Sequence, residues 1–499
     1  MNLNRSILKT SLLLLTLVEL LSLVSHVFSP LNTVAFFVSL TLVFFLSLKH
    51  LEVGLYIVIA ELIVGSFGQI FFWNLGDIFV GIRVGLFLVI MSVWLGKVLI
   101  SRDILIVIKD FWGQILSRRY LFFGIFLIWG LVWGLLKNDF ANVFFDFNSW
   151  LYFLYIFPFW QVFKYQKIKP SARLSDKLVK NTLTVIASGI IVLSIKTIIL
   201  EWFFAHQIAG TLPMLYVWIR DFRLGEITFF ANNFYRIFLQ SQIWLLLGFF
   251  MFLGVYIKNI TTPNLPKGGN KLIWLTLLLS STSLIISFSR SFWLGLIAGL
   301  GVFFLLILFK FKWSFKRVFK WGISIIGILI VEVIFIFALI NIPLVEGPAD
   351  LGSIVSNRLT SIEVAGSSRI NLLKPLMLEI VKHPIIGSGF GTTVTYKSVD
   401  PRVVARTAAG SGEYTTYAFE WGYLDIILKI GLVGFVIYVG LLTHLLKILF
   451  NRNDYIYFGF FLALIALIVT NITTPYLNHP LGIGFVVLVT VLILDSRRG

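Results

Sequence analysis

Arg290 is the residue of this sequence whose surroundings most strongly indicate chemistry. It lies in the run SFSRSFWLG, between two apolar stretches that are each long enough to cross a bilayer. A charge at a bend between two membrane helices is costly to place, so it usually has a function. The guanidinium is always charged, and its planar fork matches two phosphate oxygens. We therefore predict that Arg290 binds a lipid-linked phosphate; the alternative is that it reaches lipid headgroups.

Other arginines are candidates for the same anion. Arg236 lies where a polar segment leads into the next apolar stretch, beside Asn and Gln residues that could orient a sugar. Arg369 and Arg358 lie in a long polar segment and could close over the phosphate. Each of these guanidinium groups could share the charge of a diphosphate.

Several charges lie deep in apolar stretches, where they are expensive unless paired. Arg83 either contributes to a ligand site or forms an ion pair with Glu61 of the preceding stretch. A structural pair is also expected between Glu19 and Lys196. Asp425 and Lys429 are four residues apart on one expected helix, a spacing at which the two side chains can contact each other.

A carboxylate stands where the chain re-enters the membrane after the long polar segment. Glu420 is either a solvated residue or a general base for an acceptor hydroxyl, because partial burial raises the pKa of a carboxyl toward neutrality. His383 precedes a loop rich in Pro and Gly, whose backbone could approach a ligand closely. The sequence has no Cys and its six His are scattered, so no metal site is predicted and no cofactor is expected.

The apolar composition requires a membrane protein. Of 499 residues 58% are hydrophobic, and the mean hydropathy is +0.95. Apolar runs of about 17–25 residues recur along the chain, and each can span a bilayer as a helix. We predict an all-α polytopic fold with about fourteen (12–14) transmembrane helices. The expected spans are residues 11–28, 31–48, 51–73, 78–100, 120–136, 146–163, 181–205, 237–257, 272–288, 291–309, 322–342, 424–446, 455–472 and 481–494.

Basic residues set the predicted orientation. Most of the 41 Lys and Arg residues fall in segments on the same side as the N-terminus, which predicts that both termini are cytoplasmic. The net charge of +18 thus has a topological cause and indicates no nucleic acid partner. The exceptions are two long outer segments, about 206–236 and 343–423, that contain several arginines.

The chain is expected to form one transmembrane domain, residues 1–499, with segment 343–423 inserted as an extracytoplasmic subdomain. Within this segment, apolar residues of the stretch 368–382 are spaced for one face of an amphipathic helix lying in the membrane interface. The Gly-rich loop follows, and a polar stretch, 392–416, is expected to act as a flap.

The ordered motifs resemble the O-antigen ligase and O-antigen polymerase superfamily of bacterial envelope proteins. The run SRSFWLG at 289–295 resembles its SRxxWLG motif, and Arg236 resembles the arginine before the eighth span. The remaining matches are Arg369, then His383-Pro384 with Gly387, Gly389 and Gly391, and finally Tyr423-Leu424 with the run GLVG at 431–434.

This resemblance implies a GT-C-like glycosyltransferase in the bacterial inner membrane. Such enzymes take a glycan from undecaprenyl diphosphate on the outer face and pass it to an acceptor with inversion and without a metal. In the ligases, the arginines that match Arg290 and Arg236 hold the diphosphate, and a histidine is the suspected base. Here Glu420 occupies the position of that histidine and Trp421 that of the following Asn. A polymerase, or a ligase with a carboxylate base, therefore fits better than a lipopolysaccharide core ligase.

The acceptor could be another lipid-linked glycan, a lipid or a protein. The main alternative function is a transporter or flippase of lipid-linked glycans, in which the deep charges would form a relay. Against it, the chain has no internal repeat and no matching pair of interrupted helices. A passive scaffold is the third hypothesis, and in that case the outer arginines would not converge.

Overall fold

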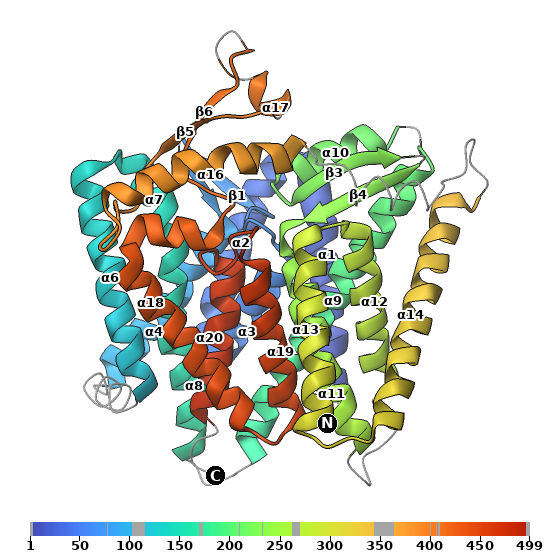
Figure 1. The fold of residues 1–499 in the computed structure, drawn as a ribbon. Coiled ribbons are helices and arrows are strands. Elements are labelled where there is room, and N and C mark those ends of the chain that lie inside the picture. Colours follow the sequence, from blue (N-terminus) through green and yellow to red (C-terminus); the bar gives the residue numbers. More distant parts are fainter. Residues whose placement is uncertain are drawn as a thin grey trace.

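The computed structural model is a bundle of long helices that is capped at one end (Figure 1). It describes residues 3–76, 78–101, 115–168, 173–208, 210–231, 233–261, 270–343, 364–399, 401–405, 407 and 410–495. The helices, with η for 3-10 helices, are α1 (Arg5–Val27), α2 (Ser29–Lys49), α3 (Leu51–Val64), α4 (Ile82–Ser101), α6 (Ile115–Lys137), α7 (Phe140–Phe147), η1 (Asn148–Tyr155), α8 (Ile156–Ile168), α9 (Arg173–Ala205), α10 (Leu212–Asp221), η2 (Gln240–Gln242), α11 (Ile243–Thr261), α12 (Asn270–Ser287), α13 (Arg290–Phe309), α14 (Phe315–Asn341), α16 (Val364–Lys382), α17 (Pro401–Val404), α18 (Gly422–Asn451), α19 (Tyr455–Thr470) and α20 (Pro480–Asp495).

Ten helices of the described chain are long and apolar enough to cross a membrane, namely α1, α2, α4, α6, α9, α11, α12, α13, α14 and α18. The helices α19 and α20 are apolar but shorter. The protein is therefore a multi-pass membrane protein, as predicted. The other predicted spans fall on α3 and on η1 with α8, so the count of 12–14 spans stays a prediction.

Short strands depart from the all-α prediction. In the described part of the chain, three antiparallel hairpins pair β1 (Phe72–Leu75) with β2 (Ile78–Gly81), β3 (Gly225–Ala231) with β4 (Phe234–Leu239), and β5 (Val394–Lys397) with β6 (Glu413–Thr416). The predicted span 51–73 is also too long, because its helix ends at Val64. Gly65 forms the C-cap, and Ser66 and Gly68 adopt left-handed backbone conformations that stop the helix.

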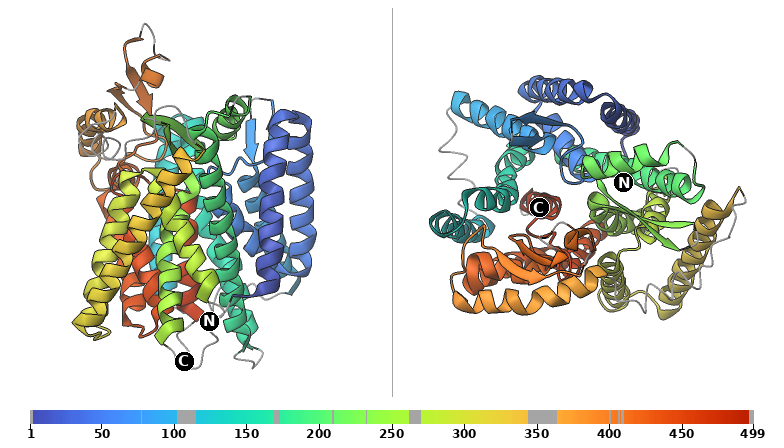
Figure 2. Two further views of the ribbon diagram at one scale, coloured as in Figure 1. Left: turned by 90° about the vertical axis from the view of Figure 1, so that its right-hand side faces the viewer. Right: turned by 90° about the horizontal axis from the view of Figure 1, so that it is seen from above.

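The core lies along α9 and α11, which are buried over most of their length. Close packing there depends on small residues: a Cβ at Gly254 of α11 would lie 2.2 Å from the carbonyl oxygen of Tyr455 in α19. In contrast, α1 and α14 expose most of their apolar side chains. Figure 2 shows both helices at the edge of the bundle, where such surfaces suit lipid contact.

One end of the bundle is covered by the elements between the long helices. Figure 1 shows α10, α16 and the strands β3 to β6 at the end opposite the two termini. The amphipathic helix predicted for 368–382 is present as α16, which packs along α18 and against β5. Its residues Leu372, Leu376 and Ile380 form a small core with Leu428 of α18. This cap is where the candidate site residues gather.

The helix α18 is interrupted at Gly431, which has φ 71° and ψ 176°. The loop after α16 completes the backbone hydrogen bonds on both sides of the interruption. The N–H groups of Leu432 and Val433 donate to the carbonyls of Pro384 and Ile385, at 2.9 and 3.2 Å. The N–H groups of Ser388 and Gly389 donate to Leu428 and Lys429, at 2.7 and 3.2 Å. The loop is thus bound into the membrane helix by its main chain.

Candidate active site

Arg290 lies at a tight bend, as the sequence predicted. The helix α12 ends at Ser287 and α13 begins at Arg290, while Phe288 adopts a left-handed backbone conformation with φ 49°. The buried ring of Phe288 packs against Phe234 at a centroid distance of 5.2 Å, which anchors the bend under the hairpin β3–β4. Arg290 itself is exposed at the capped end of the bundle.

Arg236 reaches the same bend from β4. Its Nε donates to the carbonyl oxygen of Ser287 at 3.2 Å, and its guanidinium lies 4.9 Å from the centre of the Phe238 ring. The strand β4 is also bound to α9. The buried carboxyl group of Glu201 in α9 accepts a hydrogen bond from the backbone N–H of Tyr235 at 3.1 Å. Arg236 is therefore positioned by its own side-chain contact and by the main-chain hydrogen bond of its neighbour Tyr235.

Arg369 comes to these two residues from α16. Burial lowers the pKa of the Arg369 guanidinium, and the positive charges of Arg236 and Arg290 lower it further. Glu226, on the strand that pairs with β4, opposes this effect. Arg236, Arg290 and Arg369 thus lie within electrostatic range of one another, and we call them the arginine group. Like charges held together in this way favour binding of an anion.

Glu420 contacts the arginine group directly. Its carboxylate forms an ion pair with Nε of Arg369, and its side chain is about half exposed, at 51%. The neighbouring Trp421 donates from Nε1 to the carbonyl oxygen of Arg369 at 3.0 Å. Two successive residues before α18 therefore hold both the side chain and the main chain of Arg369.

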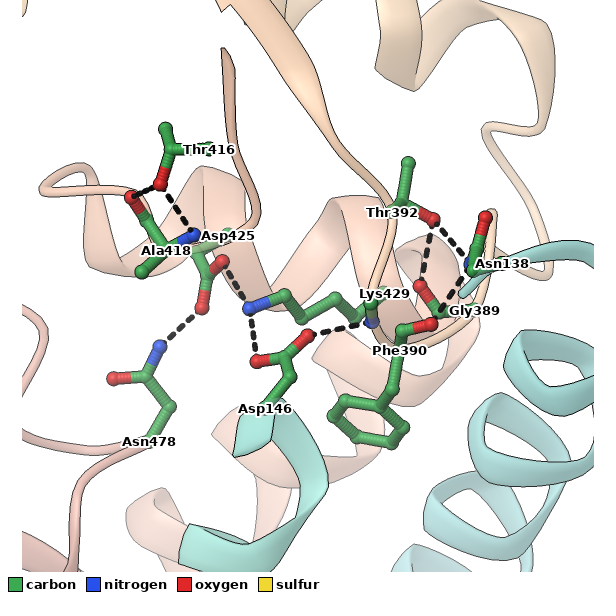
Figure 3. A network of polar contacts seen from close by, with 11 residues as sticks. Asn138, Asp146, Gly389, Phe390, Thr392, Thr416, Ala418, Asp425, Lys429 and Asn478 are labelled. Carbon is green, nitrogen blue, oxygen red and sulfur yellow. Dashed lines mark hydrogen bonds and ion pairs between the residues drawn. The ribbon is translucent and has the colours of Figure 1, made fainter. Parts of the chain in front are cut away.

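A buried charge network lies under the Gly-rich loop (Figure 3). Lys429 contacts Asp146 at 2.5 Å and Asp425 at 2.6 Å, so the predicted pair of Asp425 and Lys429 is present. Asn478 donates to Asp425, and the N–H of Gly391 donates to Asp146 at 2.8 Å. This network of Asp146, Asp425, Lys429 and Asn478 ties α7, the loop and α18 together at the interruption.

Asn138, which follows α6, forms hydrogen bonds with the Gly-rich loop on the side away from α18. Its Nδ2 donates to the carbonyl oxygen of Phe390 at 2.8 Å and to the hydroxyl of Thr392 at 3.0 Å (Figure 3). A Cβ at Gly389 would meet the backbone nitrogen of Gly134 in α6 at 2.5 Å. The loop therefore fits between α6 and α18 only with a residue that lacks a side chain at this point.

Tyr417 lies within electrostatic range of Asp146 and Lys429 of the buried charge network and of Arg223. Burial raises the pKa of its hydroxyl and the charge of Asp146 raises it further, whereas Lys429 and Arg223 lower it. The segment from Tyr417 to Trp421 therefore faces the network at one end and the arginine group at the other.

The remaining predicted site residues lie in other surroundings. Arg83 forms a buried ion pair with Glu61 at 2.9 Å, which was one of its two predicted roles. His383 is exposed after α16 and accepts a backbone hydrogen bond from Gly387 at 2.9 Å. The hydroxyl of Tyr423 donates to the carbonyl oxygen of Ile468 at 2.6 Å, which joins α18 to α19. Arg358 lies outside the described residues.

The predicted pair of Glu19 and Lys196 is also present, at 2.6 Å. Its partners lie on α1 and α9, and both are largely buried. Two of the deep charges that a transport relay would need are therefore paired with each other. Among the residues that sequence reasoning missed are Asp146 and Glu201, although each is a lone acid at the edge of an apolar run.

Residues 275–439 match the family model described as O-antigen ligase. This stretch contains the bend with Arg290, all of α16 with Arg369, the Gly-rich loop, Glu420 and the interrupted part of α18; Arg236 precedes it. No curated protein is similar enough to the chain to be named as its relative. This multi-pass membrane protein is therefore similar to O-antigen ligases over residues 275–439, and the resemblance predicted from its sequence is confirmed for that stretch.

Proposed function

We propose that the protein is a membrane glycosyltransferase that polymerises or ligates glycans from an undecaprenyl-diphosphate-linked donor at the outer face of the bacterial inner membrane. The observation that supports this function best is the convergence of Arg236, Arg290 and Arg369 at the capped end of the bundle. In the proposed orientation, the termini are cytoplasmic and the capped end is extracytoplasmic.

The arginine group keeps a net positive charge, and its guanidinium donors suit a diphosphate. Three guanidinium groups carry three positive charges, and the nearby carboxylates of Glu226 and Glu420 balance two of them. A diphosphate linked to a lipid and a sugar brings two negative charges and several oxygens that can accept paired hydrogen bonds. As the bond to the sugar breaks, negative charge grows on the departing diphosphate, and fixed cations stabilise that change.

Glu420 is the proposed base. Its carboxylate takes the proton of the acceptor hydroxyl, the acceptor oxygen forms a bond to the anomeric carbon, and the bond from that carbon to the diphosphate oxygen breaks. The electron pair of the broken bond stays on the diphosphate. Attack from the opposite face inverts the anomeric centre. The proposed step requires no metal and no cofactor, and the acceptor is a second glycan, a lipid or a protein.

The test is glycan transfer by the purified protein in lipid nanodiscs, with a lipid-diphosphate glycan, candidate acceptors and a chelator. Arg290→Ala and Arg236→Ala should each lower transfer by about 100-fold or more, because a fixed donor to the developing charge is lost. Arg220→Ala is the matched control, since Arg220 is an exposed arginine of α10 that pairs with Asp221 at 2.8 Å. Wild-type transfer by Arg290→Ala, with the protein correctly inserted, would contradict the proposal.

A further inference from the structure

The ion pair of Arg369 with Glu420 joins the group proposed to bind the donor to the group proposed to accept the proton. While the pair is formed, the carboxylate of Glu420 is engaged by a guanidinium and is a poorer acceptor for a hydroxyl proton. The guanidinium of Arg369 is in turn partly neutralised and binds a second anion less strongly. Each half of the pair thus limits the function of the other.

Both partners are held in place by other contacts. Trp421, the residue after Glu420, donates to the carbonyl oxygen of Arg369, and this bond does not depend on the charged groups. Arg369 can therefore exchange its anionic partner without separation of α16 from the start of α18. The side chains are 36% and 51% exposed, so the pair is accessible to an incoming anion and contributes little to stability.

The neighbouring charges favour such an exchange. Arg236 and Arg290 repel the guanidinium of Arg369, so a diphosphate that contacts all three gains more than the single carboxylate of Glu420 offers. We propose that the donor diphosphate replaces the carboxylate of Glu420 as the anionic partner of Arg369. The carboxylate is then free to act as base only when a donor is bound. This inference rests on the proposed function of the site.

This exchange of partners, which we call gating, makes activation of the acceptor depend on a bound donor. The released carboxylate accepts the proton of the acceptor hydroxyl, the oxygen attacks the anomeric carbon, and the diphosphate leaves with the electrons of the broken bond. Without a donor, Glu420 stays paired and no acceptor is activated. The order of events is therefore donor first and acceptor second.

The test is binding of undecaprenyl diphosphate without a glycan to the full-length protein in nanodiscs at low salt, measured beside glycan transfer. Glu420→Gln removes the competing charge, so the carrier should bind about two- to five-fold more tightly, the range expected for release of an exposed ion pair. Transfer should fall by about 100-fold or more, because the base is lost. If Glu420 had only a structural role, its substitution would not tighten binding of the carrier while slowing glycan transfer.

Glu413→Gln is the control for charge, since Glu413 is an exposed carboxylate on β6 of the same cap. It should leave both quantities at wild-type values. Glu420→Ala is a second uncharged variant, to be used if Glu420→Gln does not fold, and it should tighten binding in the same way. Equal or weaker carrier binding by a folded Glu420 variant overturns the gating. Failure of the wild-type protein to bind the carrier instead overturns the proposed function itself.

Discussion

The Nε of Arg236 lies 3.2 Å from the carbonyl oxygen of Ser287, and this contact joins the hairpin β3–β4 to the bend that carries Arg290. The two residues are 51 positions apart in the chain. The bond fixes the guanidinium beside the start of α13, so the two cations are held by one local structure. Substitutions of Arg236 and of Arg290 should therefore affect the same binding step.

Arg236→Lys should lower glycan transfer by about 10-fold or more, although the positive charge is kept. A lysine ammonium cannot present the flat fork that donates to Ser287 and also matches a phosphate in a bidentate manner. The measurement is the length and amount of glycan product under limiting donor. Arg220→Lys on α10 is the control and should leave the product unchanged. Equal activity of Arg236→Lys would mean that only the charge matters.

Gly431→Ala should destabilise the interrupted helix. A residue other than Gly at φ 71° and ψ 176° costs about 1–3 kcal/mol, and a Cβ there would lie 2.2 Å from the carbonyl oxygen of Ile385. The unfolding temperature in detergent should fall clearly. Gly440→Ala is a matched control on the same helix, where the nearest atom to the new Cβ is a nitrogen of Arg119 at 3.8 Å. Similar unfolding temperatures for the two variants would contradict the interruption.

Asp146→Ala should destabilise the protein by about 1–3 kcal/mol, because the buried ammonium of Lys429 loses one of its hydrogen-bond acceptors, although Asp425 still balances its charge. It also removes the acceptor for the N–H of Gly391. Asp139→Ala is the comparison: this exposed residue caps α7, and its loss should cost about 0.5–2 kcal/mol. Thermal unfolding of both variants measures the difference. A smaller effect at Asp146 than at Asp139 would show that the network does not hold the loop.

Arg83→Met should destabilise the protein, since Glu61 is left buried without its cation. The double variant Arg83→Met with Glu61→Leu should recover much of the stability, because no unpaired charge remains. Transfer by the stable double variant then separates the two predicted roles of Arg83. Activity near the wild-type level identifies a structural pair, whereas a stable but inactive protein identifies a ligand contact.

Local patterns were sufficient for much of the fold. Length and hydropathy predict the long helices, and the spacing of apolar residues predicts a helix over 368–382, which the structure shows from Val364 to Lys382. The bend at Arg290 follows from two apolar runs that leave almost no connecting residues. The pairs of Arg83 with Glu61 and of Asp425 with Lys429 follow from the high cost of unpaired charge in a membrane.

The missed features depend on contacts between distant segments. Asp146 and Lys429 are 283 positions apart, and no local pattern relates a single acid in one span to a lysine in another. The interruption at Gly431 depends on backbone partners supplied by residues 384–389, so apolar periodicity predicts one uninterrupted helix instead. The strands of the short hairpins are only 4–7 residues long, so strand periodicity extends over too few residues to be recognised.

The interruption of α18 also contributes to the placement of Arg369, beside the contacts that Glu420 and Trp421 make with it. At 1.5 Å per residue, Arg369 lies about 20 Å along α16 from Lys382, beyond which the chain joins the interruption. With such a lever arm, a tilt of about 5° at Lys382 would move the guanidinium by about 2 Å. The loop that is hydrogen-bonded to the interruption thus keeps the end of α16 rigid. A small displacement of this loop would cause a larger displacement of Arg369, where the phosphate is proposed to bind.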